Sequence, residues 1–131
     1  MAADRGVDVS LLVPEVVDHF FTGAAGRAHF ARLLQSDIHI FQYHPGLLHG
    51  KSVVVDDSMA ILGSANLDVR SFNLNFELTV LMYGRDAAGK LAAIHRQYVS
   101  DSCPIDGNKW MSRPALARYG ESAVSLLSPL L

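Results

Sequence analysis

Cysteine, net charge and long apolar runs are all scarce in this sequence. Cys103 is its only cysteine, which excludes an intrachain disulfide and a zinc site built from several cysteines. The formal net charge of −2 provides no general basic field and therefore disfavours nucleic acid as a partner. No apolar run approaches the roughly 18 residues that a membrane span needs, and residues 1–6 contain no apolar signal core. We expect the chain by itself to carry neither a transmembrane segment nor a signal peptide.

The sequence nevertheless contains enough apolar material for one folded core, since 50% of its 131 residues are hydrophobic. Alternating or β-branched apolar runs indicate strands, and apolar residues at helical spacing indicate helices. We predict a single domain over residues 1–131 of the α/β class, in which a mixed β-sheet is flanked by helices as an α-β-α sandwich. The expected strands span about 7–13, 38–43, 47–55, 59–64 and 75–83, and the expected helices about 23–35, 86–100 and 114–127.

One short stretch carries most of the chemistry. His49 and Lys51 are two positions apart in the strand expected at 47–55, so their side chains share a face and lie about 6.6 Å apart along the chain. A histidine is a nucleophile near neutral pH, and a lysine ammonium binds the non-bridging oxygens of a phosphate. These two residues predict a phosphoryl-transfer site.

The following strand is expected to return to the same place. A turn at Asp56 reverses the chain, and we assign that carboxylate a structural role in the turn. Ser64 and Asn66, again two positions apart, then add a hydroxyl and a carboxamide that stabilise the same oxyanion. Gly63 allows the backbone to approach closely at this point. The hairpin therefore predicts a compact set of phosphate ligands.

The complete spacing resembles that of a known family. It reads His-x-Lys-x(4)-Asp-x(6)-Gly-Ser-x-Asn, which resembles the signature of the phospholipase D superfamily. Residues 67–77, which read Leu-Asp-Val-Arg-Ser-Phe-Asn-Leu-Asn-Phe-Glu, look specifically like bacterial cardiolipin synthases. The resemblance covers nearly the whole chain and implies a phospholipase D-like half-domain. The residues that match the signature are His49, Lys51, Asp56, Gly63, Ser64 and Asn66.

The resemblance implies a role for each polar residue of the motif. His49 would form a covalent phosphohistidine intermediate, Lys51 and Asn66 would bind phosphate, and Ser64 would lie in the pocket. Glu77 matches the acidic residue of the family that orients the nucleophilic imidazole. A carboxylate in an apolar strand also needs a hydrogen-bonded partner on physical grounds, and His49 is the favoured one. We expect no metal and no other cofactor.

The resemblance also implies a partner, because cardiolipin synthases carry two such motifs and this chain carries one. It resembles the second catalytic half, so we expect the other motif to come from a second phospholipase D-like half in cis or from a homodimer partner. The expected reaction is phosphatidyl transfer between two molecules of phosphatidylglycerol, an anionic phospholipid, to give cardiolipin and glycerol. As part of a full-length enzyme the chain would act at the membrane surface, at the bacterial inner membrane.

Two other functions remain open at this stage. One is a homodimeric phosphodiesterase, either a phospholipase D or a nuclease, although the near-neutral charge and the run 67–77 weigh against a nuclease. The other is an inactive half-domain that folds and associates without turnover. A zinc site at His44 and His49 is disfavoured, because a five-residue spacing across Pro45 and Gly46 is not a helical ligand spacing.

Overall fold

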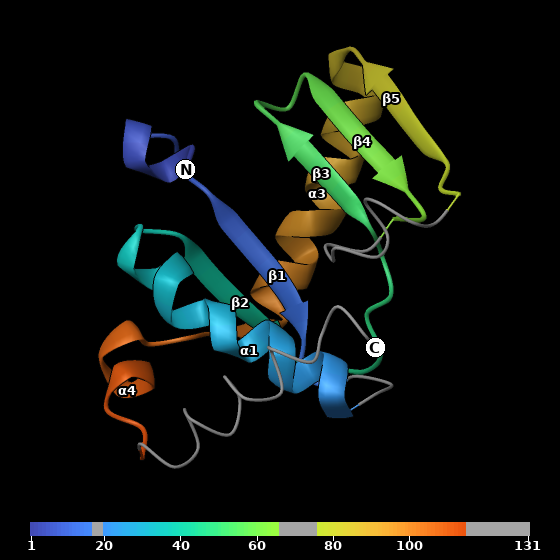
Figure 1. Ribbon diagram of the computed structural model, residues 1–131. Coiled ribbons are helices and arrows are strands. Elements are labelled where there is room, and N and C mark those ends of the chain that lie inside the picture. Colours follow the sequence, from blue (N-terminus) through green and yellow to red (C-terminus); the bar gives the residue numbers. More distant parts are fainter. Residues whose placement is uncertain (17–19, 66–75, 115–131) are drawn as a thin grey trace. The chain divides into compact units, whose positions relative to one another are not determined.

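The computed structural model describes residues 1–16, 20–65 and 76–114, and the chain divides into two compact units (Figure 1). The first unit comprises Met1–Leu48 and Asp101–Leu131, and the second comprises His49–Ser100. Each unit contains its own three-stranded sheet. The prediction of a single domain over residues 1–131 stays a prediction.

The first unit is built on a parallel strand pair with a helix between the strands. The sheet order is β1-β2-β6, with β1 and β2 parallel from Ser10↔His39 to Pro14↔Tyr43 and β6 antiparallel to β2. A parallel pair requires a crossover, and α1 provides it. The elements are η1 (Ala3–Arg5), β1 (Ser10–Pro14), α1 (Phe20–Gln35), β2 (His39–Tyr43), β6 (Ser102–Pro104) and α4 (Gly107–Met111).

The core of the first unit forms around three buried side chains, Phe30, Ile38 and Ile40. Ile40 is 1% exposed, and the rings of Phe30 and Trp110 meet with their centroids 5.2 Å apart. The guanidinium of Arg113 lies over the ring of Trp110, with its central carbon 3.4 Å from the ring centroid. Aromatic packing therefore ties the short helix α4 to α1.

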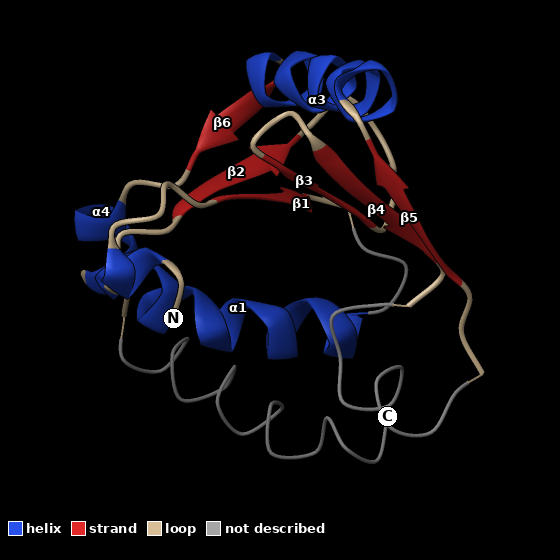
Figure 2. Ribbon diagram, turned by 90° about the horizontal axis from the view of Figure 1, so that it is seen from above, coloured by secondary structure: helices blue, strands red, loops and turns tan. Residues whose placement is uncertain are grey.

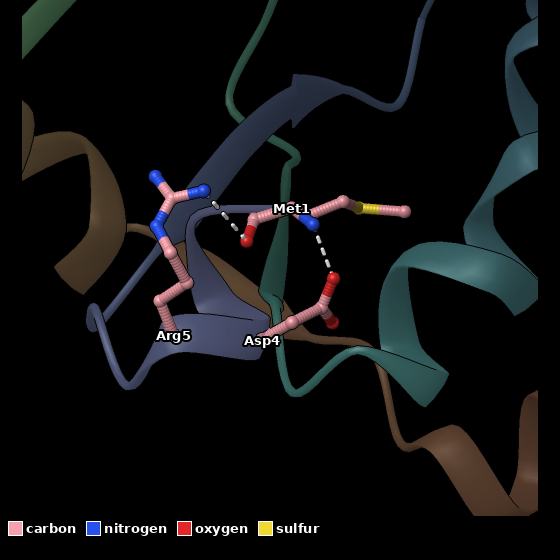
Figure 3. A network of polar contacts seen from close by, with 3 residues as sticks. All are labelled: Met1, Asp4 and Arg5. Atoms are coloured by element: carbon pink, nitrogen blue, oxygen red, sulfur yellow. Dashed lines mark hydrogen bonds and ion pairs between the residues drawn. The ribbon is translucent and has the colours of Figure 1, made fainter.

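Polar contacts stabilise the short helices α4 and η1 of the first unit. The Asp106 carboxylate caps α4 by accepting hydrogen bonds from the backbone N–H groups of Asn108 (2.8 Å) and Lys109 (3.1 Å). At η1, the amine of Met1 pairs with the Asp4 carboxylate, and Arg5 Nη1 donates to the Met1 carbonyl at 3.5 Å (Figure 3). The hydrogen bond from that amine is the main cause that lowers the pKa of Asp4.

The second unit is an antiparallel sheet covered by one long helix. Its strands are β3 (Ser52–Val55), β4 (Met59–Gly63) and β5 (Thr79–Tyr83), and α3 (Arg85–Ser100) lies over one face (Figure 2). Ala88 and Ala92 on α3 are buried, as is Ala60 on β4. Small side chains at this contact let the helix backbone approach the sheet closely.

A hydrogen bond with a partly buried ring also joins α3 to the sheet. Ser52 Oγ lies 2.8 Å from His95 Nε2, in a partly buried position. Burial lowers the pKa of His95 from its ordinary value of 6.5, because the charged imidazolium loses solvation under the helix. The neutral ring is therefore the form that the fold favours.

The predicted fold class is confirmed, with mixed strands flanked by helices, but several boundaries were wrong. The expected strand 47–55 begins only at Ser52, and the strand expected at 75–83 begins at Thr79. The strands form two sheets of three rather than one of five, and the short elements β6 and α4 were not predicted. Residues 115–127 of the helix expected at 114–127 lie outside the described residues. Among the residues that are described, no helix is long and apolar enough to cross a membrane.

Two glycines of the second unit should respond oppositely to the same substitution. Gly84 has a φ of 105° and immediately precedes α3, whereas Gly89 lies inside that helix with open space around it. Gly84→Ala should lower the free energy of unfolding by about 1–2 kcal/mol, because an L residue is strained at positive φ. Gly89→Ala should raise it by about 0.5–1 kcal/mol, since alanine favours the helix. Urea unfolding followed by circular dichroism measures both, and equal signs would contradict the assigned backbone conformations.

The stability of the chain should depend on pH through His95. The unfolded chain binds a proton near the ordinary pKa of 6.5, while the folded chain resists it, so the free energy of unfolding should fall as pH decreases through about 6.5. His95→Gln should remove this component. His29→Gln, which changes an exposed histidine on α1, is the matched control and should leave the component in place. Denaturation midpoints between pH 5.5 and 7.5 provide the comparison.

Candidate active site

The β3–β4 hairpin brings the two ends of the sequence motif together. Its turn closes with a hydrogen bond from Ser58 N to Val55 O (3.1 Å), and Asp56 and Asp57 both have a φ of 50°. These φ values are those of a type I′ turn, whose twist matches that of paired strands. Asp56 therefore lies in the turn, as predicted, and its side chain is exposed.

Lys51 and Gly63 are neighbours across the open end of this hairpin. The Gly63 N–H donates to the Lys51 carbonyl at 2.9 Å, which extends the ladder one residue beyond Ser52↔Leu62. A Cβ atom at position 63 would lie 3.1 Å from both the Leu78 carbonyl oxygen and Thr79 Oγ1. Little room therefore exists for a side chain at Gly63, on the side that faces Leu78 and Thr79.

His49 and Lys51 lie just before β3 rather than within it, which corrects the prediction that both occupy a strand. Residues 47–51 are not in a strand, His49 is exposed, and Lys51 is half-buried. The hairpin has only one further ladder bond at this end, so strand pairing does not hold the segment as far as His49. Lys51 Nζ donates instead to the His49 carbonyl at 3.3 Å, which links the two residues through the backbone.

Ser64 and Glu77 form a hydrogen-bonded pair that sequence reasoning missed. Ser64 Oγ donates to Glu77 Oε2 at 2.5 Å and accepts from the Leu78 N–H at 3.0 Å. The Ser64 N–H also donates to the Leu78 carbonyl at 3.0 Å. The half-buried Glu77 carboxylate is thus held beside the glycine end of β4. The register between β4 and β5 would have predicted this pair. Continuing from Gly63↔Thr79 by one residue places Ser64 opposite Leu78, next to Glu77.

The catalytic and phosphate-binding roles of the predicted site residues stay predictions. Asn66 lies outside the described residues, so its place beside Lys51 is untested. The expected hydrogen bond from Glu77 to His49 is also untested, and Ser64 is one partner of this carboxylate. To donate a hydrogen bond to a phosphate, the Ser64 hydroxyl would have to give up its hydrogen bond to Glu77.

Two other histidines, His44 and His39, have acidic neighbours within the first unit. His44 Nδ1 lies 2.5 Å from Glu15 Oε2, which pairs the residues that follow β2 and β1 in the first unit. His39 lies 3.8 Å from Asp8, with both side chains largely exposed. Over residues 1–16, 20–65 and 76–114, no group of three or more histidine, cysteine or acidic side chains is arranged to hold a metal ion.

Comparison with known proteins agrees with the motif. The family described as "Cardiolipin synthase, PLD-like domain" matches residues 1–99. Cardiolipin synthase A from Citrobacter koseri is 43% identical over 130 residues, and the enzymes of that name from Escherichia coli and Klebsiella pneumoniae are 42% identical. Each match covers 99% of this chain and 27% of the relative, so the chain spans about a quarter of their length.

The fold is also similar to a solved structure. Nuc from Salmonella typhimurium, a phospholipase D family member, matches with a TM-score of 0.68. The match covers 79% of this chain and 68% of Nuc at 21% identity, which shows a shared fold. With its motif, its fold and its similarity over nearly its full length, the chain belongs to the phospholipase D-like domain family of cardiolipin synthases.

Proposed function

We propose that this chain supplies one half of a phosphatidyltransferase site that converts two phosphatidylglycerol molecules into cardiolipin and glycerol. The observation that carries the proposal is the assembled end of the hairpin, where Lys51 is bonded to Gly63 and Ser64 holds Glu77, in a chain 42–43% identical to cardiolipin synthase A. As part of a full-length enzyme it would act at the surface of the bacterial inner membrane, where its lipid substrate lies.

The proposed reaction has two displacements at phosphorus. His49 attacks the phosphodiester, a P–N bond forms, and the bond from phosphorus to the departing glycerol oxygen breaks. That oxygen takes a proton from the histidine of the second half. The hydroxyl of the acceptor phosphatidylglycerol returns a proton to that histidine and attacks phosphorus. The P–N bond then breaks, and His49 is regenerated.

Polar groups of this chain stabilise the charges that develop in these steps. The ammonium of Lys51 neutralises non-bridging oxygens, and Asn66 adds amide donors to the same oxygens. Glu77 orients the His49 imidazole and stabilises its positive charge. The Ser64 bond to Glu77 supports this role, because it fixes the carboxylate before substrate binds. The lysines of two halves would supply the positive charge of the complete site.

A second half is needed because one motif provides one histidine. Exposed apolar side chains on the second unit support this requirement, since a large apolar surface is costly in water and marks contact with further protein or lipid. Phe76 is fully exposed, and Leu78 is 72% exposed. The others that are exposed on its sheet are Val53, Val55, Leu62, Val80, Leu81 and Tyr83.

Hydrolysis by two copies of the chain is the second candidate. The likeness in fold to Nuc favours it, because a single Nuc chain of comparable size matches most of this chain. In that arrangement water would replace the acceptor lipid, and the substrate would be a phospholipid or another phosphodiester. A third outcome is a half-domain that associates without turnover.

His49→Ala should abolish the reaction in a preparation that contains the chain and its complementing half. We expect the rate of cardiolipin formation from phosphatidylglycerol vesicles to fall by at least about a thousandfold, because the covalent route disappears with its nucleophile. Thin-layer chromatography of radiolabelled lipid measures the product. His39→Ala, at an exposed position on β2, is the matched control and should retain activity.

The same assay separates the candidates. Cardiolipin formation supports transfer, whereas phosphatidic acid as the sole product from a sedimenting homodimer supports hydrolysis. Cleavage of DNA with no lipid turnover would refute the lipid substrate. Absence of all turnover with the second half bound, together with unchanged association of His49→Ala, would identify an inactive half-domain.

Ser64→Ala and Glu77→Gln should not be additive in their effects on the rate. The hydroxyl of Ser64 donates its only proton to Glu77, so both substitutions disturb the same carboxylate. We expect the double variant to lose about as much activity as Glu77→Gln alone. Multiplying losses would instead indicate that Ser64 contacts the phosphate independently of Glu77. Initial rates of the four proteins at saturating lipid complete the cycle.

A further inference from the structure

The hydrogen bond between Ser52 and His95 lies directly beside the motif without belonging to it. Ser52 is the first residue of β3, and His95 is on the last half of α3. Their atoms Oγ and Nε2 are 2.8 Å apart in a partly buried position. The contact therefore joins the start of the strand to a helix that is distant in sequence.

Lys51 lies at the boundary between backbone that is paired in the sheet and backbone that is not. On its C-terminal side, β3 pairs with β4 from Ser52↔Leu62 onward. On its N-terminal side, residues 47–50 are outside any strand. The Lys51 carbonyl receives one hydrogen bond, from Gly63 N–H at 2.9 Å. Any restraint on Ser52 is transmitted to Lys51 across one peptide bond.

We propose that Ser52 and His95 are positioning residues for Lys51, and this inference rests on the proposed function of Lys51 as a phosphate ligand. Consecutive residues of an extended backbone project to opposite faces. Because the Ser52 side chain is bonded toward α3, the Lys51 side chain is directed to the other face. The bond thus fixes the face on which the ammonium can meet a phosphate.

The partner of Ser52 is well suited to this task. The α3 helix is seated on the sheet by the buried Ala88 and Ala92, so the backbone that carries His95 has little freedom. Burial favours the neutral ring, and a neutral ring with its proton on Nδ1 accepts the Ser52 hydroxyl proton at Nε2. A side chain mounted on a rigid element holds geometry more closely than one on a loop.

Hydrogen exchange at the Gly63 amide tests the inference without any need for turnover. This amide is bonded to the Lys51 carbonyl, so its exchange rate reports how firmly that carbonyl is held. NMR-detected exchange on the whole chain, in native buffer, compares the wild type with Ser52→Ala and His95→Asn. We expect both variants to exchange this amide about fivefold faster, the ratio that a lost hydrogen bond produces.

Two conservative variants separate the hydrogen bond from mere packing. The amide of Gln reaches the position of Nε2, so His95→Gln should restore slow exchange, whereas the shorter Asn does not reach it. Ser52→Thr keeps the hydroxyl and should also behave like the wild type. The control amide is that of Ile61, one ladder step further in, opposite Val53, which should not change.

The possible outcomes are decisive for the positioning role. Equal rates in Ser52→Ala and the wild type would overturn it. Equal acceleration in His95→Gln and His95→Asn would show that ring packing, not the hydrogen bond, is responsible. Acceleration of every ladder amide by the same factor would show global destabilisation and would overturn it too.

A kinetic arm connects the restraint to the reaction. In a preparation that forms cardiolipin, His95→Asn should lower kcat by about fivefold or more with little change in KM, and His95→Gln should restore it, because a misplaced ammonium loses transition-state contacts. Altered exchange with no dependence of kcat on either variant would overturn the role in catalysis. If no preparation turns over, the proposed function fails, while the exchange experiment still decides the restraint on Lys51.

Discussion

The register of the β3–β4 hairpin is the constraint on which the candidate site depends. The bond from Gly63 N–H to the Lys51 carbonyl places the ends of the motif side by side, and it forms only if Ser52 pairs with Leu62. Side chains alternate along a strand, so a slip by one residue would turn every side chain of β3 to the other face. Ser52 would then leave His95, and the packing of β3 against α3 would change. The same register thus fixes both the contact of β3 with α3 and the backbone at Lys51.

Long elements with strong apolar patterns were predictable, and short ones were not. The helix Arg85–Ser100 and the strand His39–Tyr43 lie within a residue or two of the predicted bounds, because each has a periodic pattern that its own sequence displays. The strand Ser102–Pro104 has three residues and depends on pairing with β2, which is distant in sequence. The start of β3 was placed too early for a related reason, since apolar residues at 47 and 48 fit a strand pattern but gain no ladder partner.

The candidate site shows the same division between local and distant information. The residue types at His49, Lys51 and Ser64 were evident from the spacing, as was the turn at Asp56. The bond between Ser64 and Glu77 was not, because it depends on how β5 pairs with β4 and on which of several polar groups receives the single proton of the hydroxyl. A half-buried carboxylate needs a hydrogen-bonded partner, but the sequence alone does not select which one.

The packing of Trp110 has a consequence for spectroscopy. It is the only tryptophan of the chain, and its ring contacts Phe30 and Arg113, all within the first unit. Selectively excited tryptophan fluorescence therefore reports the unfolding of that unit alone, while far-ultraviolet circular dichroism sums the helices of both. A comparison of the two signals across one denaturant series measures whether the units unfold cooperatively, because coincident transitions are the mark of a single cooperative structure.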